Sequence, residues 1–349
     1  MELKNIILLH APGNGNEYIE NLISAYERNS ETPIKYGVKL VLDTHENSLI
    51  HIQRPELLYS FYKDILKLND AEITDIIKDK IQELARKNTI IYTVHNLVPH
   101  DRTEEKFKII YKIVYEYSDI IAHHGEYSKL HFEKNSLAPT ATHIVCPHGP
   151  YRHNLKTTNS KSDIPKVLNV GRQRTYKGNR FLLVALKANV FDACMLSTVG
   201  PLIVTGKSFW VRLIKIFFEK IIHQLFAVSF GNYSFKFCSL SHDELHKEVN
   251  SADCLILGHS SGLTTGLIPL AISHNKAFIY PMIGNFSDQS KHYTAAYPYI
   301  ANDVQSLQNA VEKFVYDFYS VKVIDNESWL NSNSWDHHVQ TILKSISGK

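Results

Sequence analysis

The chain has 349 residues with a formal net charge of +3, and 44% of its residues are hydrophobic and 21% charged. This length is typical of two domains, and the composition excludes a chain that is disordered throughout. The net charge is too small to indicate a nucleic-acid-binding surface, although it is compatible with anionic ligands or lipid headgroups. The first apolar run is too short for a signal sequence or a membrane span, so we expect a cytoplasmic protein. The four cysteines lie far apart in or beside apolar runs, which favours buried free thiols over disulfides or a metal site.

The first half of the chain alternates short apolar runs with amphipathic segments. Helical periodicity occurs between several of these runs, for example in residues 16–29 and 104–118. This alternation is typical of βαβ units, whose strands form a parallel sheet. The runs that resemble strands lie at 5–10, 39–42, 49–53, 89–94, 119–124 and 143–147.

Residues 149–164 interrupt this alternation with polar and turn-forming residues, as expected of a linker between domains. We predict an α/β fold of two Rossmann-like, doubly wound parallel sheets that face a cleft, with domains at 1–163 and 164–326. Open sheets of this kind bind ligands beyond the carboxyl ends of their strands, so the chemistry is expected there. The strand-like runs of the second half lie at 166–171, 193–199, 233–239, 253–258 and 277–281.

One loop of the second half, "HSSGLTTG" at 259–266, follows a predicted strand and precedes an apolar helix. Its glycines let a ligand approach the backbone, its hydroxyls can donate hydrogen bonds, and the helix end supplies N–H groups, so the loop suits an anion. The alternative is that Thr264 or Thr265 only caps the helix and the glycines only turn the chain. The candidate ligand-binding residues are Ser261, Gly262, Thr264, Thr265 and Gly266.

A second loop, "GRQRTYKG" at 171–178, brings Arg172, Arg174 and Lys177 to the end of the first strand of this half. A guanidinium group can donate hydrogen bonds to two phosphate oxygens at once, and an ammonium adds a point charge, so the loop suits a pyrophosphate. The alternative is a solvated basic turn. Two such loops on one sheet favour an anion site.

Several segments resemble bacterial GT-B glycosyltransferases of the family-4 type, which assemble capsule, exopolysaccharide and O-antigen. The segments are "VGRQRTYKGNRFLL" and "SGLTTGLIPLAISHNKAFIYPMIG" in the second half and "LIHIQRPELLY", "TVHNLVPHD" and "CPHGPY" in the first. The resemblance implies transfer of a sugar from a nucleotide-diphosphate sugar to a hydroxyl acceptor, often a lipid-linked saccharide. It also implies that the second domain binds the donor, and that a C-terminal helix within 327–349 joins the acceptor-side first domain.

The sequence also departs from this family. Many relatives carry two glutamates eight positions apart around the second motif, one of which holds the nucleotide ribose, and Gly262 and Leu270 stand at the aligned positions here. The cations of the two loops and the helix end can stabilise a departing diphosphate, so we expect no metal and no cofactor beyond the nucleotide sugar. No DxD motif occurs, and "DTHE" at 43–46 is expected to be solvated surface.

The acceptor hydroxyl must be oriented or deprotonated, and "TVHNLVPHDRTEEK" supplies candidates at the end of a strand. His95 and Asp101 are the catalytic candidates, and His100 is placed on the acceptor or sugar side. The alternative for Asp101 is an N-cap that forms a capping box with Glu104. The remaining acceptor-side or sugar-side candidates, which a plain turn would explain equally well, are Gly13 and Asn14.

Residues 208–226 form the most apolar predicted helix, with charged residues on one face and a broad apolar sector. Two interpretations stay open: a helix packed in the core of the second domain, or peripheral contact with the inner face of the plasma membrane. Two other functions also stay open, namely a nucleotide-sugar epimerase of the same architecture and a non-catalytic subunit that binds a sugar nucleotide.

Overall fold

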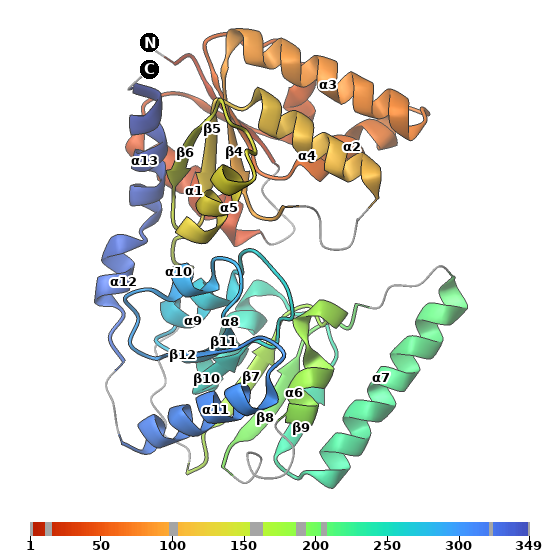
Figure 1. Cartoon of the computed structure of the whole chain (residues 1–349), viewed down its shortest axis with the longest axis vertical. Coiled ribbons are helices and arrows are strands. Elements are labelled where there is room, and N and C mark those ends of the chain that lie inside the picture. The colour runs from red at the N-terminus through yellow and green to blue at the C-terminus, as the bar shows by residue number, and fades with distance from the viewer. Residues whose placement is uncertain are drawn as a thin grey trace. The chain divides into compact units, whose positions relative to one another are not determined.

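The structure is a computed structural model of the whole chain (Figure 1). It divides into two compact units, of which unit 1 comprises Met1–Tyr151 and Asn331–Lys349 and unit 2 comprises Arg152–Leu330. The expected divisions at 163/164 and 326/327 thus fall at 151/152 and 330/331 in the structure. The structure describes residues 3–10, 16–97, 104–153, 163–185, 193–203, 208–320 and 324–347.

Unit 1 is built on a parallel sheet of six strands in the order β2-β1-β3-β4-β5-β6. Its central strands are buried along their whole length, as expected of a sheet with helices on both faces. Because β1 is followed by β2 on one side and by β3 on the other, the strand order reverses between β1 and β3. The strands are β1 (Ile6–Leu9), β2 (Ile34–Tyr36), β3 (Leu49–Ile52), β4 (Thr89–Val94), β5 (Ile120–His123) and β6 (Thr142–Val145).

Helices cover this sheet through their apolar faces. The C-terminal helix α13 packs on α1, where Trp335, Val339 and Ile342 join the core formed with the strands. Asp336 at the start of α13 accepts a hydrogen bond from Arg28 at 2.8 Å. The helices of unit 1 are α1 (Glu17–Asn29), α2 (Pro55–Ile65), α3 (Asp70–Lys87), α4 (Glu105–Tyr117), α5 (Glu126–Lys134) and α13 (Trp335–Ser347).

Unit 2 repeats this architecture with a second parallel sheet of six strands, in the order β12-β11-β10-β7-β8-β9. Here the chain runs from β7 through β8 to β9 and then crosses to β10, so the order reverses between β7 and β10. The strands are β7 (Lys166–Val170), β8 (Met195–Val199), β9 (Tyr233–Lys236), β10 (Cys254–Ile256), β11 (Ala277–Pro281) and β12 (Ala296–Tyr299).

Helices α8, α9 and α11 pack on strands of this sheet, and α7 lies at its outer edge, where it contacts β9 (Figure 1). Trp329 of α12 is buried and donates a hydrogen bond to the carbonyl oxygen of Gln289 at 2.7 Å. The helices are α6 (Asn179–Ala185), α7 (Phe209–Ser229), α8 (His242–Ser251), α9 (Leu267–Ser273), α10 (Phe286–Ser290), α11 (Val304–Tyr319) and α12 (Glu327–Ser332).

The predicted α/β fold with two doubly wound parallel sheets is confirmed, and all four cysteines are free. One predicted strand is wrong, because residues 39–42 belong to a 3₁₀ helix, η1 (Val38–Leu42), of which only Val41 is buried. Two edge strands, β2 and β12, were not predicted. Core packing of the 208–226 helix is also wrong, since His223 is the only buried residue of α7.

Candidate functional site

In unit 2, the two loops predicted to bind an anion flank the point where the strand order reverses. The loop at 171–178 follows β7, and the loop at 257–266 follows β10, the neighbouring strand. In open α/β sheets this reversal opens a crevice at the carboxyl ends of the strands, where ligands bind. The fold therefore brings both predicted loops to the position where a ligand is expected.

The two loops contact each other through their backbones. The backbone N–H of Ser260 donates to the carbonyl oxygen of Tyr176 at 2.8 Å, and the Ser260 hydroxyl lies 3.2 Å from the same oxygen. Gly178 has a left-handed φ of 65°. A Cβ at this position would overlap the carbonyl oxygen of Gly258. Only glycine allows this approach, so the loops form one unit with a fixed spacing.

Lys177 lies where the first loop meets the start of α9. A Cβ built on Gly171 would lie 3.6 Å from the Lys177 Nζ and 4.0 Å from the Leu267 side chain. Burial, followed by the positive charges of Arg174 and Arg172, lowers the pKa of Lys177 to about 8. A lysine whose charge is disfavoured by burial and by two neighbouring cations is stabilised by an anion that approaches all three.

The second loop is held by hydrogen bonds that the sequence did not reveal. The backbone N–H of Thr265 donates to the Gln289 side chain at 3.2 Å, and the Gln289 amide donates to the Thr265 carbonyl at 3.0 Å. The Thr265 hydroxyl accepts from the N–H of Leu267 at 3.2 Å. The Thr265 hydroxyl therefore satisfies a backbone N–H in the first turn of α9, although the N-cap residue is Gly266 rather than Thr264 or Thr265.

The other predicted residues of this loop differ in exposure. Ser261 is exposed, whereas Gly262 and Thr264 are partly buried. α9 has only seven residues, so its helix dipole is short and the cations of the first loop carry most of the positive charge. Leu270 is buried in α9. Neither Gly262 nor Leu270, the two positions aligned with the family's glutamates, supplies a carboxylate.

In unit 1, a histidine follows four of the six strands, at the carboxyl edge of the sheet. These are His10 after β1, His95 after β4, His124 after β5 and His148 after β6. Tyr18 of α1 lies among them, with ring centroids 4.8 Å from His95 and 5.0 Å from His148. Of these four histidines, only His95 was predicted from the sequence, although the recurrence of His at or shortly after a strand end in "LLHAPG", "IAHHG" and "CPHG" was a usable signal.

His95 belongs to a hydrogen-bond network that begins at β3. Its Nε2 lies 2.7 Å from the Oε1 of Gln53, and the Gln53 amide nitrogen lies 2.8 Å from the Nε2 of His51. The other nitrogen of His51 lies 2.9 Å from the Tyr26 hydroxyl. With the Gln53 amide in this orientation, the Nε2 of His95 carries the proton and its Nδ1 is the basic nitrogen.

Three of these histidines, His95, His124 and His148, are neutral at physiological pH because burial lowers their pKa values. Burial, followed by the nearby His124 and Arg54, holds the pKa of His95 well below its usual value. Burial also lowers the pKa of His148 to about 4 and that of His51 to about 3. A neutral imidazole presents one donor and one acceptor, which suits it to orienting hydroxyl groups more than to removing their protons.

The remaining predicted site residues lie outside the described residues: Gly13, Asn14, His100 and Asp101. The capping-box interpretation of Asp101 is nevertheless wrong, because α4 begins at Glu105 with Glu104 as its N-cap. In "DTHE", His45 bonds the Leu40 carbonyl at 2.8 Å and Glu46 pairs with Lys87 at 2.6 Å. Within the described ranges, no group of three or more His, Cys, Asp or Glu side chains is arranged to hold a metal ion.

The chain is similar to solved structures over nearly its whole length. It is 14% identical to Anabaena HepE, solved in complex with UDP, with 99% of this chain and 100% of that chain covered and a TM-score of 0.69. The fold is GT-B. Sucrose-phosphate synthase from Thermosynechococcus elongatus is 14% identical, with 97% and 94% of the two chains covered and a TM-score of 0.60. The trehalose 6-phosphate synthase of Burkholderia multivorans is 10% identical, with 95% and 74% covered and a TM-score of 0.58. No protein-family model and no curated protein matches the sequence.

Proposed function

We propose that this chain is a glycosyltransferase that moves a sugar from a nucleotide-diphosphate sugar to a hydroxyl acceptor. The observation that carries the proposal is the convergence of two loops, with three cations, at the strand-order reversal of unit 2. The fold adds support, since HepE has been solved with UDP, with UDP and glucose, and with UDP-glucose.

The donor part of the proposal rests on charge. Cleavage of a sugar–phosphate bond leaves negative charge on a diphosphate, and stabilisation of that charge is usually a large part of catalysis. Arg172, Arg174 and Lys177 supply three positive charges beside glycine-rich backbone, so we propose that the reaction needs no metal ion. Lys177 gains most from the anion, because the bound negative charge offsets the cost that burial imposes on its ammonium.

The acceptor part rests on unit 1. Its sheet edge presents neutral imidazoles from separate strands, held in place by Tyr18 and by the Gln53 side chain. Such groups can orient a sugar hydroxyl through hydrogen bonds. We propose that His95 orients the acceptor hydroxyl, and that the acceptor is a saccharide linked to a lipid, as in the assembly of bacterial surface polysaccharide.

A panel of nucleotides and nucleotide sugars, screened by thermal shift with EDTA present, tests the donor site without knowledge of the acceptor. We expect one nucleoside diphosphate and its sugar conjugate to raise the melting temperature. A requirement for Mg²⁺ or Mn²⁺ would contradict the metal-free proposal, and no stabilisation by any nucleotide would contradict the donor site.

A second assay separates transfer from its alternatives. Release of nucleoside diphosphate only when an acceptor is added, from a panel of lipid-linked and free saccharides, is expected of a transferase. A change of the sugar without an acceptor would indicate an epimerase. Activity that appears only with another protein would indicate a binding subunit.

A further inference from the structure

Helix α7 of unit 2 carries its apolar side chains on the face that points away from its own domain. Trp210, Phe217 and Val228 are 72%, 62% and 76% exposed. Surface helices of globular proteins normally show the opposite arrangement, with the apolar stripe toward the core. The exposed apolar residues that repeat every three or four positions are Trp210, Ile214, Phe217, Phe218, Ile221, Leu225 and Val228.

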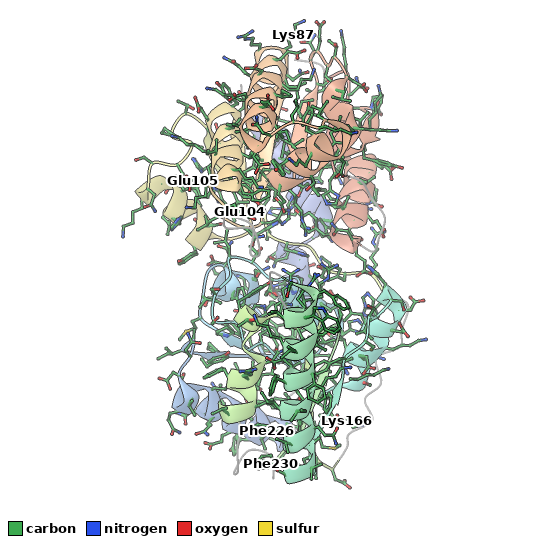
Figure 2. The ribbon with its side chains drawn as sticks, turned by 90° about the vertical axis from the view of Figure 1, so that its right-hand side faces the viewer. Lys87, Glu104, Glu105, Lys166, Phe226 and Phe230 are labelled. Atoms are coloured by element: carbon green, nitrogen blue, oxygen red, sulfur yellow. The ribbon has the colours of Figure 1, made fainter. Side chains whose placement is uncertain are left out.

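The opposite face of α7 fixes this orientation. His223, the one buried residue of the helix, hydrogen-bonds the Tyr233 hydroxyl, and its ring lies 5.5 Å from Phe235 and 4.8 Å from Phe237. Figure 2 looks onto the outward side of α7, with Phe226 and Phe230 marking its C-terminal end. Rotation of the helix to bury its apolar face would remove His223 from these partners.

Lysines border the outward apolar face on both sides. At 100° per residue, Lys215 lies beyond one edge of the apolar sector and Lys220 beyond the other. Glu219, the one acidic residue of α7, pairs with Arg180 at 2.6 Å. A cavity of about 450 Å³ between α7 and the segment that follows β7 is lined by Arg174, Arg180 and Lys215 together with Glu219, so this edge of the apolar face carries an excess of positive charge.

We infer that α7 docks unit 2 on an anionic lipid bilayer, lying in the interface with its outward apolar face among the acyl chains. Aromatic and aliphatic side chains on one face with flanking lysines are the pattern of an interfacial helix, whose cations reach lipid phosphates. The apolar face runs from residue 210 to 228, a length of about 27 Å at the rise of an α-helix. Among the described residues, no helix is long and apolar enough to cross a membrane.

Charge favours a bilayer over a second copy of this chain. A two-fold contact through α7 would bring the flanking lysines of both copies together, and the one carboxylate of each helix is already paired with Arg180. Anionic headgroups offer the complementary charge. The purpose of this docking rests on the proposed function, since it brings the enzyme to the surface that holds a lipid-linked acceptor, whereas the docking itself is independent of transfer.

The test is flotation of the full-length protein with vesicles of phosphatidylcholine containing phosphatidylglycerol, compared with vesicles of phosphatidylcholine alone. We expect binding to the anionic vesicles, with about fivefold weaker affinity for each of Lys215→Gln and Lys220→Gln. Trp210→Glu should weaken binding by more than tenfold. Tyr316→Glu on α11 is the matched control, because Tyr316 is also 72% exposed, and it should bind as the native protein does.

Tryptophan fluorescence gives a direct second readout. The chain has three tryptophans, and Trp329 and Trp335 are buried, so a shift of emission to shorter wavelength on adding anionic vesicles reports Trp210. Nucleotide binding, measured on the same preparations, should be unchanged in Trp210→Glu and Lys220→Gln. A native protein that binds vesicles but no nucleotide would contradict the proposed donor site and would still support docking through α7.

Two results would overturn the inference. The first is a protein that stays away from anionic vesicles and elutes as a monomer. The second is a dimer that Trp210→Glu converts to a monomer, which would identify a second copy of the chain as the partner of α7.

Discussion

The α-carbon of Gly178 faces the carbonyl oxygen of Gly258 so closely that a Cβ on Gly178 would overlap it. This approach joins the loop after β7 to the loop after β10, and it sets the distance between the cations of one loop and the hydroxyls of the other. Two segments about 80 residues apart in the chain therefore act as a single candidate donor site.

Gly178→Ala is expected to separate these loops. The new Cβ overlaps the Gly258 carbonyl oxygen, and alanine disfavours the left-handed backbone conformation that Gly178 adopts. We therefore expect the free energy of unfolding to fall by about 1–3 kcal/mol and diphosphate binding to weaken. Urea unfolding and nucleotide titration measure both effects. Gly231→Ala is the control, because a Cβ there meets no atom within 4 Å. Equal behaviour of the two variants would contradict the close approach.

Diphosphate affinity should depend on pH through Lys177. Its pKa of about 8 means that the ammonium is present below that pH and is lost above it. We therefore expect Kd to rise above about pH 8, by up to about tenfold per pH unit, until the higher pKa of the complex is passed. Calorimetric titration between about pH 7.5 and 9.5 measures this. Lys177→Arg should flatten the dependence, because a guanidinium stays charged throughout; a native affinity that is constant over this range would place Lys177 away from the anion.

His95→Ala distinguishes orientation of the acceptor from general base catalysis. A general base contributes about 10²–10⁴ in rate, whereas a neutral hydrogen bond contributes about tenfold. The lowered pKa of His95 favours the smaller loss, so we expect turnover to fall about tenfold, with nucleotide affinity unchanged. The native rate should show no acidic limb from His95 between about pH 6 and 8. A loss near 10⁴, with an acidic limb near 6.5 that the variant lacks, would instead make His95 the base.

The protein should lose stability on mild acidification. His51, His148 and His338 are buried in unit 1, and their pKa values are lowered to about 3, 4 and 4. Because the unfolded histidines have a pKa near 6.5, the unfolded state binds more protons below that pH. The free energy of unfolding is therefore highest above about pH 6.5. Below that pH it falls by about 1.4 kcal/mol per pH unit for each such histidine, until the pKa of the folded state is reached.

Urea unfolding at several pH values between about 7.5 and 5 measures this slope. His338→Phe should reduce it by about the contribution of one histidine. His337→Gln, at the exposed neighbouring position, should leave it unchanged. A native protein whose stability is constant over this range would contradict the burial of neutral histidines.

The sequence predicted the parts of the fold that hydrophobic patterning determines. Central strands such as β4 and β11 are continuous apolar runs, because both faces of the sheet are covered, and they were found. Two of the four edge strands were missed: β2 is largely exposed, and β12 contains Pro298, which an edge strand tolerates but which is typical of a loop in sequence. Residues 40–42 are apolar but only Val41 is buried, so their composition predicted a strand where the structure has a 3₁₀ helix.

The candidate site divides in the same way. Cations and glycines adjacent in sequence, as in the loop at 171–178, could be recognised together. The Gln289 clamp on Thr265 and the ring of histidines around Tyr18 depend on residues brought together only by the fold. No local sequence pattern pairs Thr265 with Gln289 or Tyr18 with the histidines, so these contacts could be found only in the tertiary structure.

The most direct test of the donor site is calorimetric titration with UDP, GDP, ADP and TDP in EDTA, using the native protein and two variants. Arg172→Ala and Lys177→Ala should each weaken the preferred diphosphate by about ten- to a hundredfold, the value of a hydrogen bond to a charged group. Lys166→Ala, at the opposite end of β7 (Figure 2), is the control and should bind as the native protein does. Metal-independent binding that both loop variants weaken and the control preserves is the predicted result; unchanged affinity in both loop variants would contradict the account.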